Sequence, residues 1–429
     1  MTTIARLALR PAAAVRAGRL PPRVAFALQV SILVGLLAAS SAPTPLYAVY
    51  QAAWGFSSIT VTVVFGVYAV AVLAALLVVG GLSDHVGRRP VLLVAIGLQL
   101  VALLVFATAG GVLALLIARV VQGLSTGAAV AALGAGLLDL HRTRGAIANG
   151  VAPLLGTASG ALVSGVLIQY LPAPTELVYL TLVAIFVIQG IGVALMSETS
   201  LRKPGALASL RPQIGVPDAA RRPLLVAAPV LVAVWALGGF YASLGPSLAR
   251  LVVGSDSHVL GGLALFALAG SASLTVALTR TLSPRAVMAL GSVALATGVA
   301  ITLLAVAQRS GIAFFAGTVV AGVGFGAGFQ GGLRTVLPLA AAHERAGVLS
   351  IVYAVCYLAM GLPAVIGGVL VVHGGLLVTA REYGIAVIAL AGLALLGMVG
   401  LRPREPVPAA AVRVCPCAAR RVAQSTARG

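Results

Sequence analysis

The sequence predicts an all-α membrane protein in which twelve transmembrane helices form two pseudo-symmetric six-helix halves. The chain of 429 residues is 60% apolar and only 9% charged, whereas soluble proteins carry about 25% charged residues. Long segments contain no Asp, Glu, Lys or Arg, for example from Arg23 to Asp84 and from Arg89 to Arg119. Because a membrane-spanning helix needs about 20 apolar residues, these segments can cross a bilayer. Their continuous Ala, Leu, Val and Gly content favours helices over alternating barrel strands.

Charged residues and Pro/Gly clusters separate the apolar runs and mark the ends of the expected helices. The twelve spans lie near residues 24–49, 57–82, 90–109, 112–138, 145–170, 176–197, 223–249, 258–281, 284–307, 311–339, 346–372 and 383–401. We therefore expect five parts: an N-terminal tail (1–22), a first six-helix half (23–198), a linker (199–222), a second six-helix half (223–401) and a basic C-terminal tail (402–429).

The distribution of basic residues predicts the orientation. Most of the 28 Lys and Arg residues fall in the tails, the linker and the loops on the same side as the tails, and only Arg250, Arg309 and Arg381 fall in loops opposite. Cytoplasmic segments are enriched in Lys and Arg, so both termini are expected in the cytoplasm. The net charge of +19 then reflects topology and attraction to anionic lipid headgroups, and we expect no nucleic-acid partner. The Arg-rich N-terminal tail also fits an organelle transit peptide.

An internal repeat relates spans four and ten. "ARVVQGLSTGAA" aligns with "GTVVAGVGFGAG", so that Gly123 matches Gly322 and Gly127 matches Gly326. The match falls where two equivalent halves would place it, and such repeats are the plan of many secondary transporters.

Two motifs stand out in the first half. The loop between spans two and three, "GGLSDHVGRR", contains Gly80, Asp84, Gly87, Arg88 and Arg89, and span four contains "RVVQGLSTG". Both motifs resemble signatures of the major facilitator superfamily. The span count, the linker and both motifs agree with this family over nearly the whole chain. His85 stands where the family usually has Arg, and span five only partly matches the antiporter pattern. The resemblance implies alternating access coupled to an ion gradient, with protons as the expected coupling ion.

The loop between spans two and three is expected to act as a gate. Asp84 can face the positive N-terminal end of span eleven, a contact that exists only while the cytoplasmic side is closed. Arg88 and Arg89 can pair with Asp139 at the end of span four, while Gly80 and Gly87 permit close helix approach and a tight turn. The positive-inside rule alone also explains the two arginines, but not an acid at this boundary.

Charged side chains within a bilayer are costly and usually functional. Arg119 lies about two turns into span four with Gln122 on the same face. Gln330 and Arg334 occupy the second half of span ten, where Arg334 can also snorkel to the interface. These residues are expected to line a polar path between the halves.

Aromatic residues provide the other expected lining of the path, namely Trp235 and Tyr241 in span seven and Tyr357 in span eleven. Membrane aromatics also commonly face lipid or lie at the interface. Gly and Pro are dense around Tyr241, and "SSAPTPLY" in span one contains Pro43 and Pro45. Spans one and seven are therefore expected to bend.

The sequence favours a secondary transporter that moves a small organic solute, with efflux of a drug or metabolite ahead of uptake of a sugar or organic acid. No acidic residue lies in the middle of a span, which favours neutral or anionic substrates. A channel is disfavoured by the paired halves, and an enzyme by the lack of a catalytic constellation. We expect a monomer in a bacterial inner membrane. No metal or cofactor is expected, because Cys415 and Cys417 have no nearby His.

Overall fold

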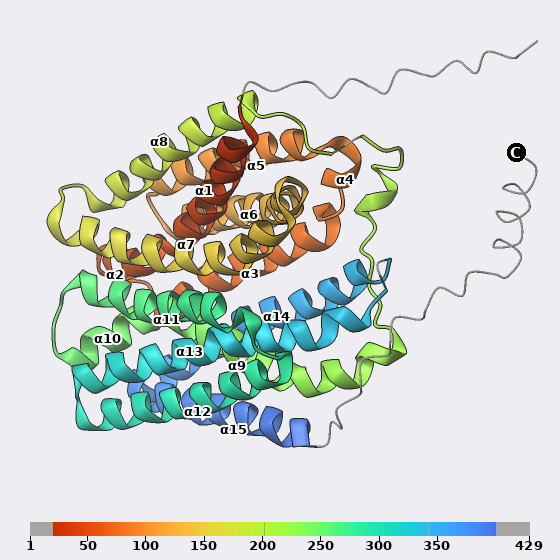
Figure 1. Cartoon of the computed structure of the whole chain (residues 1–429). Coiled ribbons are helices and arrows are strands. Elements are labelled where there is room, and N and C mark those ends of the chain that lie inside the picture. The colour runs from red at the N-terminus through yellow and green to blue at the C-terminus, as the bar shows by residue number, and fades with distance from the viewer. Residues whose placement is uncertain (1–19, 201, 342, 400–429) are drawn as a thin grey trace, which may run out of the picture.

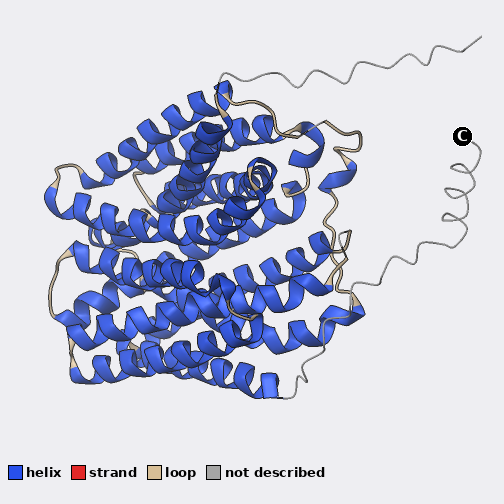
Figure 2. Ribbon diagram, in the orientation of Figure 1, coloured by secondary structure: helices blue, strands red, loops and turns tan. Residues whose placement is uncertain are grey.

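The computed structural model describes residues 20–200, 202–341 and 343–399, which form helices and the loops between them (Figure 2). Twelve helices in these residues are long and apolar enough to cross a membrane. The predicted fold class is confirmed. The basic residues and cysteines assigned to the two tails lie mostly outside the described residues.

The elements form two groups that follow one another in the sequence and lie side by side in Figure 1. The first group contains α1 (Pro22–Ser41), α2 (Pro43–Trp54), α3 (Ser58–Val79), α4 (Ser83–Val86), α5 (Arg88–Ala107), α6 (Val112–Leu140), α7 (Arg142–Tyr170) and α8 (Pro174–Leu195). The second group contains α9 (Asp218–Ser243), α10 (Gly245–Val253), α11 (His258–Leu278), α12 (Pro284–Gln308), α13 (Gly311–Val336), α14 (Arg345–Gly374) and α15 (Leu376–Val399). Short 3-10 turns η1 (Ala208–Leu210), η2 (Thr279–Thr281) and η3 (Leu337–Leu339) complete the structure.

Spans one and seven are broken where the sequence predicts bending. Span one divides between α1 and α2, and Pro43 is the first residue of α2. Span seven divides at Leu244, which joins α9 to α10. Proline removes a backbone donor and interrupts the helical ladder, so the sequence itself accounts for the break in span one.

The last span starts earlier than predicted. α15 begins at Leu376, so that Arg381 lies within its second turn instead of in a loop. The charge pattern alone puts the boundary after this arginine. An exposed Arg near a helix end can extend its side chain toward the headgroups, so the charge does not end the span.

Each half has its own apolar core. Leu36, Leu92 and Leu133 are fully buried in the first half, whereas Val234 and Leu295 are fully buried in the second. Large apolar side chains also cover the outside of the bundle, as expected where lipid replaces water. Examples are Leu113, Ile312 and Leu396, which are exposed.

The aligned glycines of the internal repeat play the same part in each half. A Cβ at Gly123 of α6 would lie 2.8 Å from the Tyr68 carbonyl oxygen of α3, and one at Gly322 of α13 would lie 3.0 Å from the Leu268 carbonyl carbon of α11. Span four therefore packs on span two as span ten packs on span eight. Small residues let membrane helices approach this closely.

The two halves meet along two helix pairs, α7 with α11 and α3 with α14. In the second pair, a Cβ at Gly66 would lie 3.0 Å from a Val365 methyl, and one at Gly361 would lie 3.3 Å from the Ala69 Cβ. In the first pair, the Ser273 hydroxyl donates to the Val151 carbonyl at 3.1 Å. The interface between the halves is therefore built largely from small side chains.

Candidate functional site

The loop of residues 80–89, which the sequence predicts to act as a gate and which we call the gate loop, is built around the Arg88 guanidinium. Arg88 begins α5, and only 8% of its side chain is exposed. Its Nε donates to Asp139 Oδ2 of α6 at 3.3 Å and its Nη1 to the Ser83 hydroxyl at 2.6 Å. Arg88 also forms an ion pair with Asp84. One buried cation thus joins the loop to the end of α6.

Asp84 is turned toward its own loop. Its ion-pair partner among the described residues is Arg88, and 53% of its side chain is exposed. The expected neighbour, the first turn of α14, is contacted instead by the linker, since a Cβ at Gly347 would lie 3.0 Å from the Gly215 nitrogen. The structure therefore does not bring Asp84 and the N-terminus of α14 together through a described contact.

Arg89 differs from its expected position. Its guanidinium donates to the Ala194 carbonyl near the end of α8, not to Asp139. Successive residues of a helix point about 100° apart, so the Arg89 side chain leaves α5 in a different direction from that of Arg88 and reaches α8. Gly80 lies against α6, where its Cβ would be 3.9 Å from the Ala131 Cβ.

Glu198, just past the end of α8, is the residue of this site that the sequence does not single out. Its carboxylate accepts the backbone N–H of Arg88 at 2.8 Å and that of Arg89 at 3.1 Å. The first N–H groups of a helix have no partner inside it, and Glu198 supplies one. The one available signal is an acid directly after a span, on a side rich in arginine.

A second polar site surrounds Arg119 inside the first half. The side chain is fully buried. Its Nε and Nη2 donate to the Tyr47 hydroxyl of α2 at 3.1 and 2.5 Å, and its Nη1 donates to Gln122 Oε1 at 2.7 Å and to the Ser40 carbonyl at 2.8 Å. The structure brings Arg119 and Gln122 together, as their spacing predicts. It adds Tyr47, which sequence reasoning missed.

Aromatic rings enclose the same guanidinium. Its carbon atom lies 5.2 Å from the ring centre of Tyr68, 5.6 Å from that of Phe106 and 5.7 Å from that of Tyr47. A cation over an aromatic face is stabilised by about 0.5–2 kcal/mol. These contacts hold a charge in place without a carboxylate.

The break in span one creates acceptors for this site. The Ala39 carbonyl would normally accept the N–H of residue 43, but Pro43 has none. Gln122 Nε2 donates to this carbonyl at 3.1 Å. Beside the break, the Ser164 hydroxyl of α7 donates at 2.6 Å to the carbonyl of Ala42, the residue between α1 and α2. The bend and the polar side chains around it therefore depend on each other, since freed backbone groups in a membrane must find partners.

Gln330 and Arg334 of α13 lie beside α11 and the η2 turn, within the second half. Gln330 bonds the Thr279 hydroxyl at 2.8 Å and the Val276 carbonyl at 3.2 Å, and Arg334 Nη2 donates to the Leu282 carbonyl at 2.8 Å. Gln330 holds the C-terminal end of α11, whose last carbonyls lack helical partners. Arg334 holds the residue that follows η2. The described bonds thus connect the two side chains to α11 and the turn after it, and not to the Arg119 site.

The predicted aromatic residues separate into two groups. The Trp235 ring of α9 lies 4.9 Å from that of Tyr357 in α14 and 5.6 Å from that of Phe329 in α13. Its indole nitrogen is buried without a hydrogen-bond partner among the described residues. A polar group left unpaired in this way is available to an acceptor on a bound molecule or water.

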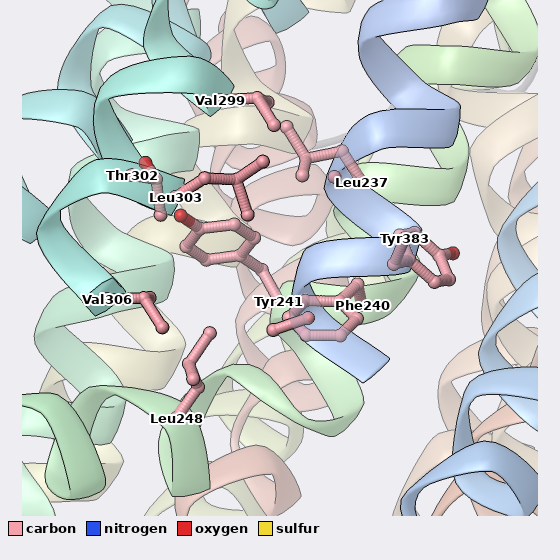
Figure 3. Close-up of a pocket in the computed structure, with 11 residues that line it drawn as sticks. Leu237, Phe240, Tyr241, Leu248, Val299, Thr302, Leu303, Val306 and Tyr383 are labelled. Atoms are coloured by element: carbon pink, nitrogen blue, oxygen red, sulfur yellow. The ribbon is translucent and has the colours of Figure 1, made fainter. Parts of the chain in front are cut away.

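Tyr241 belongs to the interior of the second half. Its hydroxyl bonds that of Thr318 at 2.8 Å. Figure 3 shows its ring beside Leu303, in a cavity of about 30 Å³ that is also lined by Thr302 and Tyr383. A space of this size holds about one water molecule, so the cavity is too small for an organic solute.

Comparison with known proteins gives one matching family model and several similar solved structures. A family model described as Major Facilitator Superfamily matches residues 30–297. The fold is similar to the crystal structure of the human organic anion transporter MFSD10 (TETRAN), with a TM-score of 0.64 and 19% identity over 89% of this chain and 99% of that one. It is also similar to the crystal structure of a point mutant of the nucleoside transporter NupG, with a TM-score of 0.66 and 12% identity over 87% of this chain and 99% of that one. The search of curated proteins finds no match.

Proposed function

The chain belongs to the major facilitator superfamily and is a multi-pass membrane transporter, and we propose that it exports a drug or metabolite across a bacterial inner membrane. In this proposal both termini are cytoplasmic, the protein acts as a monomer, and an ion gradient, most simply of protons, drives alternating access. The substrate is a small neutral or anionic organic solute.

The observation that carries the proposal is the way the two halves meet. Each half has its own core, and small side chains of α3 and α14 form much of one interface, with Gly66 near Val365 and Gly361 near Ala69. Two bodies that each keep their own core and meet through small side chains can rock against each other without losing those cores. That motion is what alternating access requires.

The distribution of charged side chains favours a neutral or anionic substrate over a cationic one. Within the described residues, every acidic side chain lies in a loop or within two turns of a helix end. A cationic substrate would find no carboxylate at mid-membrane depth. Arg119 is fully buried about two turns into α6, where its hydrogen-bond partners are hydroxyl, amide and carbonyl groups, so the net charge of this region is positive. A positive region of low dielectric attracts anions and repels cations.

An accumulation assay tests the direction and the substrate class together. The protein is expressed in a bacterial strain that lacks its own major efflux pumps, and the strain is exposed to matched neutral, anionic and cationic compounds. We expect lower accumulation of some neutral or anionic compounds than in cells that express Arg119→Gln at the same membrane level. Higher accumulation, with new growth on a sugar or organic acid, would show uptake and contradict the proposed direction.

A further inference from the structure

The linker between the halves begins on a firmly held residue. The Glu198 carboxylate is partly buried and accepts four backbone N–H groups. Two belong to the start of α5, Arg88 at 2.8 Å and Arg89 at 3.1 Å. The others belong to the linker itself, Thr199 at 3.0 Å and Ser200 at 3.1 Å. One carboxylate therefore joins the gate loop to the first turn of the linker.

The position of this carboxylate is favourable for electrostatic reasons. α5 has 20 residues, and an anion at the N-terminus of such a helix is stabilised by the helix dipole. Hydrogen bonds to an ionised acceptor are also about twice as strong as neutral ones. Gly87 has a φ of +104°, and a Cβ there would lie 2.9 Å from the Glu198 carboxyl carbon. Glycine at this position thus makes room for Glu198 as well as for the turn.

Beyond Glu198 the linker continues along the gate loop. The Lys203 N–H donates to the His85 carbonyl at 3.0 Å. A Cβ at Gly81 would lie 3.9 Å from the Ser209 Cβ in η1. The linker is therefore held against the first half at Glu198, Lys203 and Ser209. These contacts give it a defined path, unlike a flexible connection.

The far end of the linker contacts the second half. A Cβ at Gly347, in the first turn of α14, would lie 3.0 Å from the Gly215 nitrogen and 3.1 Å from its carbonyl oxygen. α14 is the helix that packs against α3. Figure 1 shows the linker passing α4 on its way to α9. A single segment thus contacts the gate loop at one end and the first turn of α14 at the other.

We propose that this segment, residues 198–200 and 202–217, is a strap that couples the gate loop to α14, and that Glu198 is the positioning residue that anchors it. The coupling rests on the proposed function, since it matters only if the halves move relative to each other. Two charge-assisted bonds, from the N–H groups of Arg88 and Arg89, fix the strap to the gate loop at Glu198. At its other end the strap packs against Gly347 of α14 through Gly215, and against the core of the second half through Val216. Loosening the anchor at Glu198 is therefore expected to loosen the segment that packs against Gly347 of α14 as well.

Disulfide crosslinking tests the docking. Gly81→Cys and Ser209→Cys are introduced together into a chain whose three native cysteines are replaced by Ala, because a Cβ separation near 3.9 Å suits a disulfide. We expect rapid disulfide formation on mild oxidation and slower formation in Glu198→Ala, since losing about 1 kcal/mol of docking lowers the ratio of docked to undocked strap about fivefold. The control is Glu176→Ala, which removes an acid from the first turn of α8 instead. It should leave the rate of disulfide formation unchanged.

Hydrogen exchange tests the coupling in the same proteins. Glu198→Ala should speed amide exchange in the gate loop and also at residues 212–217, far along the strap. Glu198→Gln keeps one acceptor oxygen and should give an intermediate result, which also serves if Glu198→Ala does not fold. Faster exchange in the gate loop alone would make Glu198 a local cap and overturn the coupling. Absent or Glu198-independent crosslinking would overturn the docking. Neither measurement requires a substrate, so a wrong transport function would not be mistaken for a failed strap.

Discussion

Replacing Tyr47 by Phe tests whether the buried Arg119 guanidinium depends on the Tyr47 hydroxyl, which the second helix of span one supplies. The Tyr47 hydroxyl accepts two of the guanidinium N–H groups, at 3.1 and 2.5 Å. Phe would keep the ring that lies 5.7 Å from the guanidinium carbon but would remove the acceptor. The substitution therefore isolates the hydrogen bonds from the packing and from the cation–π contact.

We expect Tyr47→Phe to lower the free energy of unfolding by about 1–3 kcal/mol. Side-chain hydrogen bonds measured inside membrane proteins contribute about 0.6 kcal/mol each, so two of them give about 1.2 kcal/mol as the lower value. A buried donor left without any partner costs about 1–3 kcal/mol, and more where it is charged. Arg119 has no exposed surface through which water can replace the hydroxyl, so the upper value applies if the site cannot rearrange.

Reversible unfolding in mixed micelles measures this change as a difference in unfolding free energy. Tyr241→Phe is the matched control, because that hydroxyl is equally buried but has a neutral partner, Thr318, at 2.8 Å; it should cost about 0.6 kcal/mol. In an Arg119→Gln background the effect of Tyr47→Phe should shrink, since the charge has gone. Equal costs for Tyr47→Phe and Tyr241→Phe would show that the Tyr47 hydroxyl does not support the guanidinium.

Three further outcomes are expected. Ser255→Cys should react with an impermeant thiol reagent from outside the cell, while a tag in the linker should be accessible only from inside; the reverse labelling would refute the orientation. Asp84→Asn should reach the membrane at normal levels but slow the initial rate of transport, and an unchanged rate would exclude a gate role. Gly123→Ala should lower the unfolding free energy by about 1–3 kcal/mol through overpacking against α3. Gly97→Ala, where a Cβ meets no atom within 4 Å, should not lower it.

The fold was predictable because it depends on local properties of the chain. The length and apolar character of each run decide whether it crosses a membrane, and twelve such runs correspond to the twelve helices of the described residues. Pro43, followed by Pro45, removes backbone donors at the point where span one breaks. The glycines of span four also predicted where helices pack closely, since Gly123 marks a helix surface that another backbone approaches.

The candidate site was predictable only in part. Arg119 and Gln122 are one turn apart, so their contact at 2.7 Å follows from helix geometry. The proximity of Arg88 to Asp139, at 3.3 Å, was anticipated from the ends of adjacent spans. Arg334 was a candidate for the path because of its depth, but in the structure it binds the carbonyl of Leu282, the residue that follows η2.

The sequence by itself determined which segments cross the membrane, where they bend and which few charges lie among them, because each of these depends on neighbouring residues. Only the tertiary structure decided the partners of those charges. Tyr47 is 72 positions from Arg119, and Glu198 is 110 positions from Arg88. No periodicity or spacing relates residues so far apart. Their contacts are set by how the helices pack, and a buried cation or an unpaired helix N-terminus takes whichever acceptor that packing brings within reach.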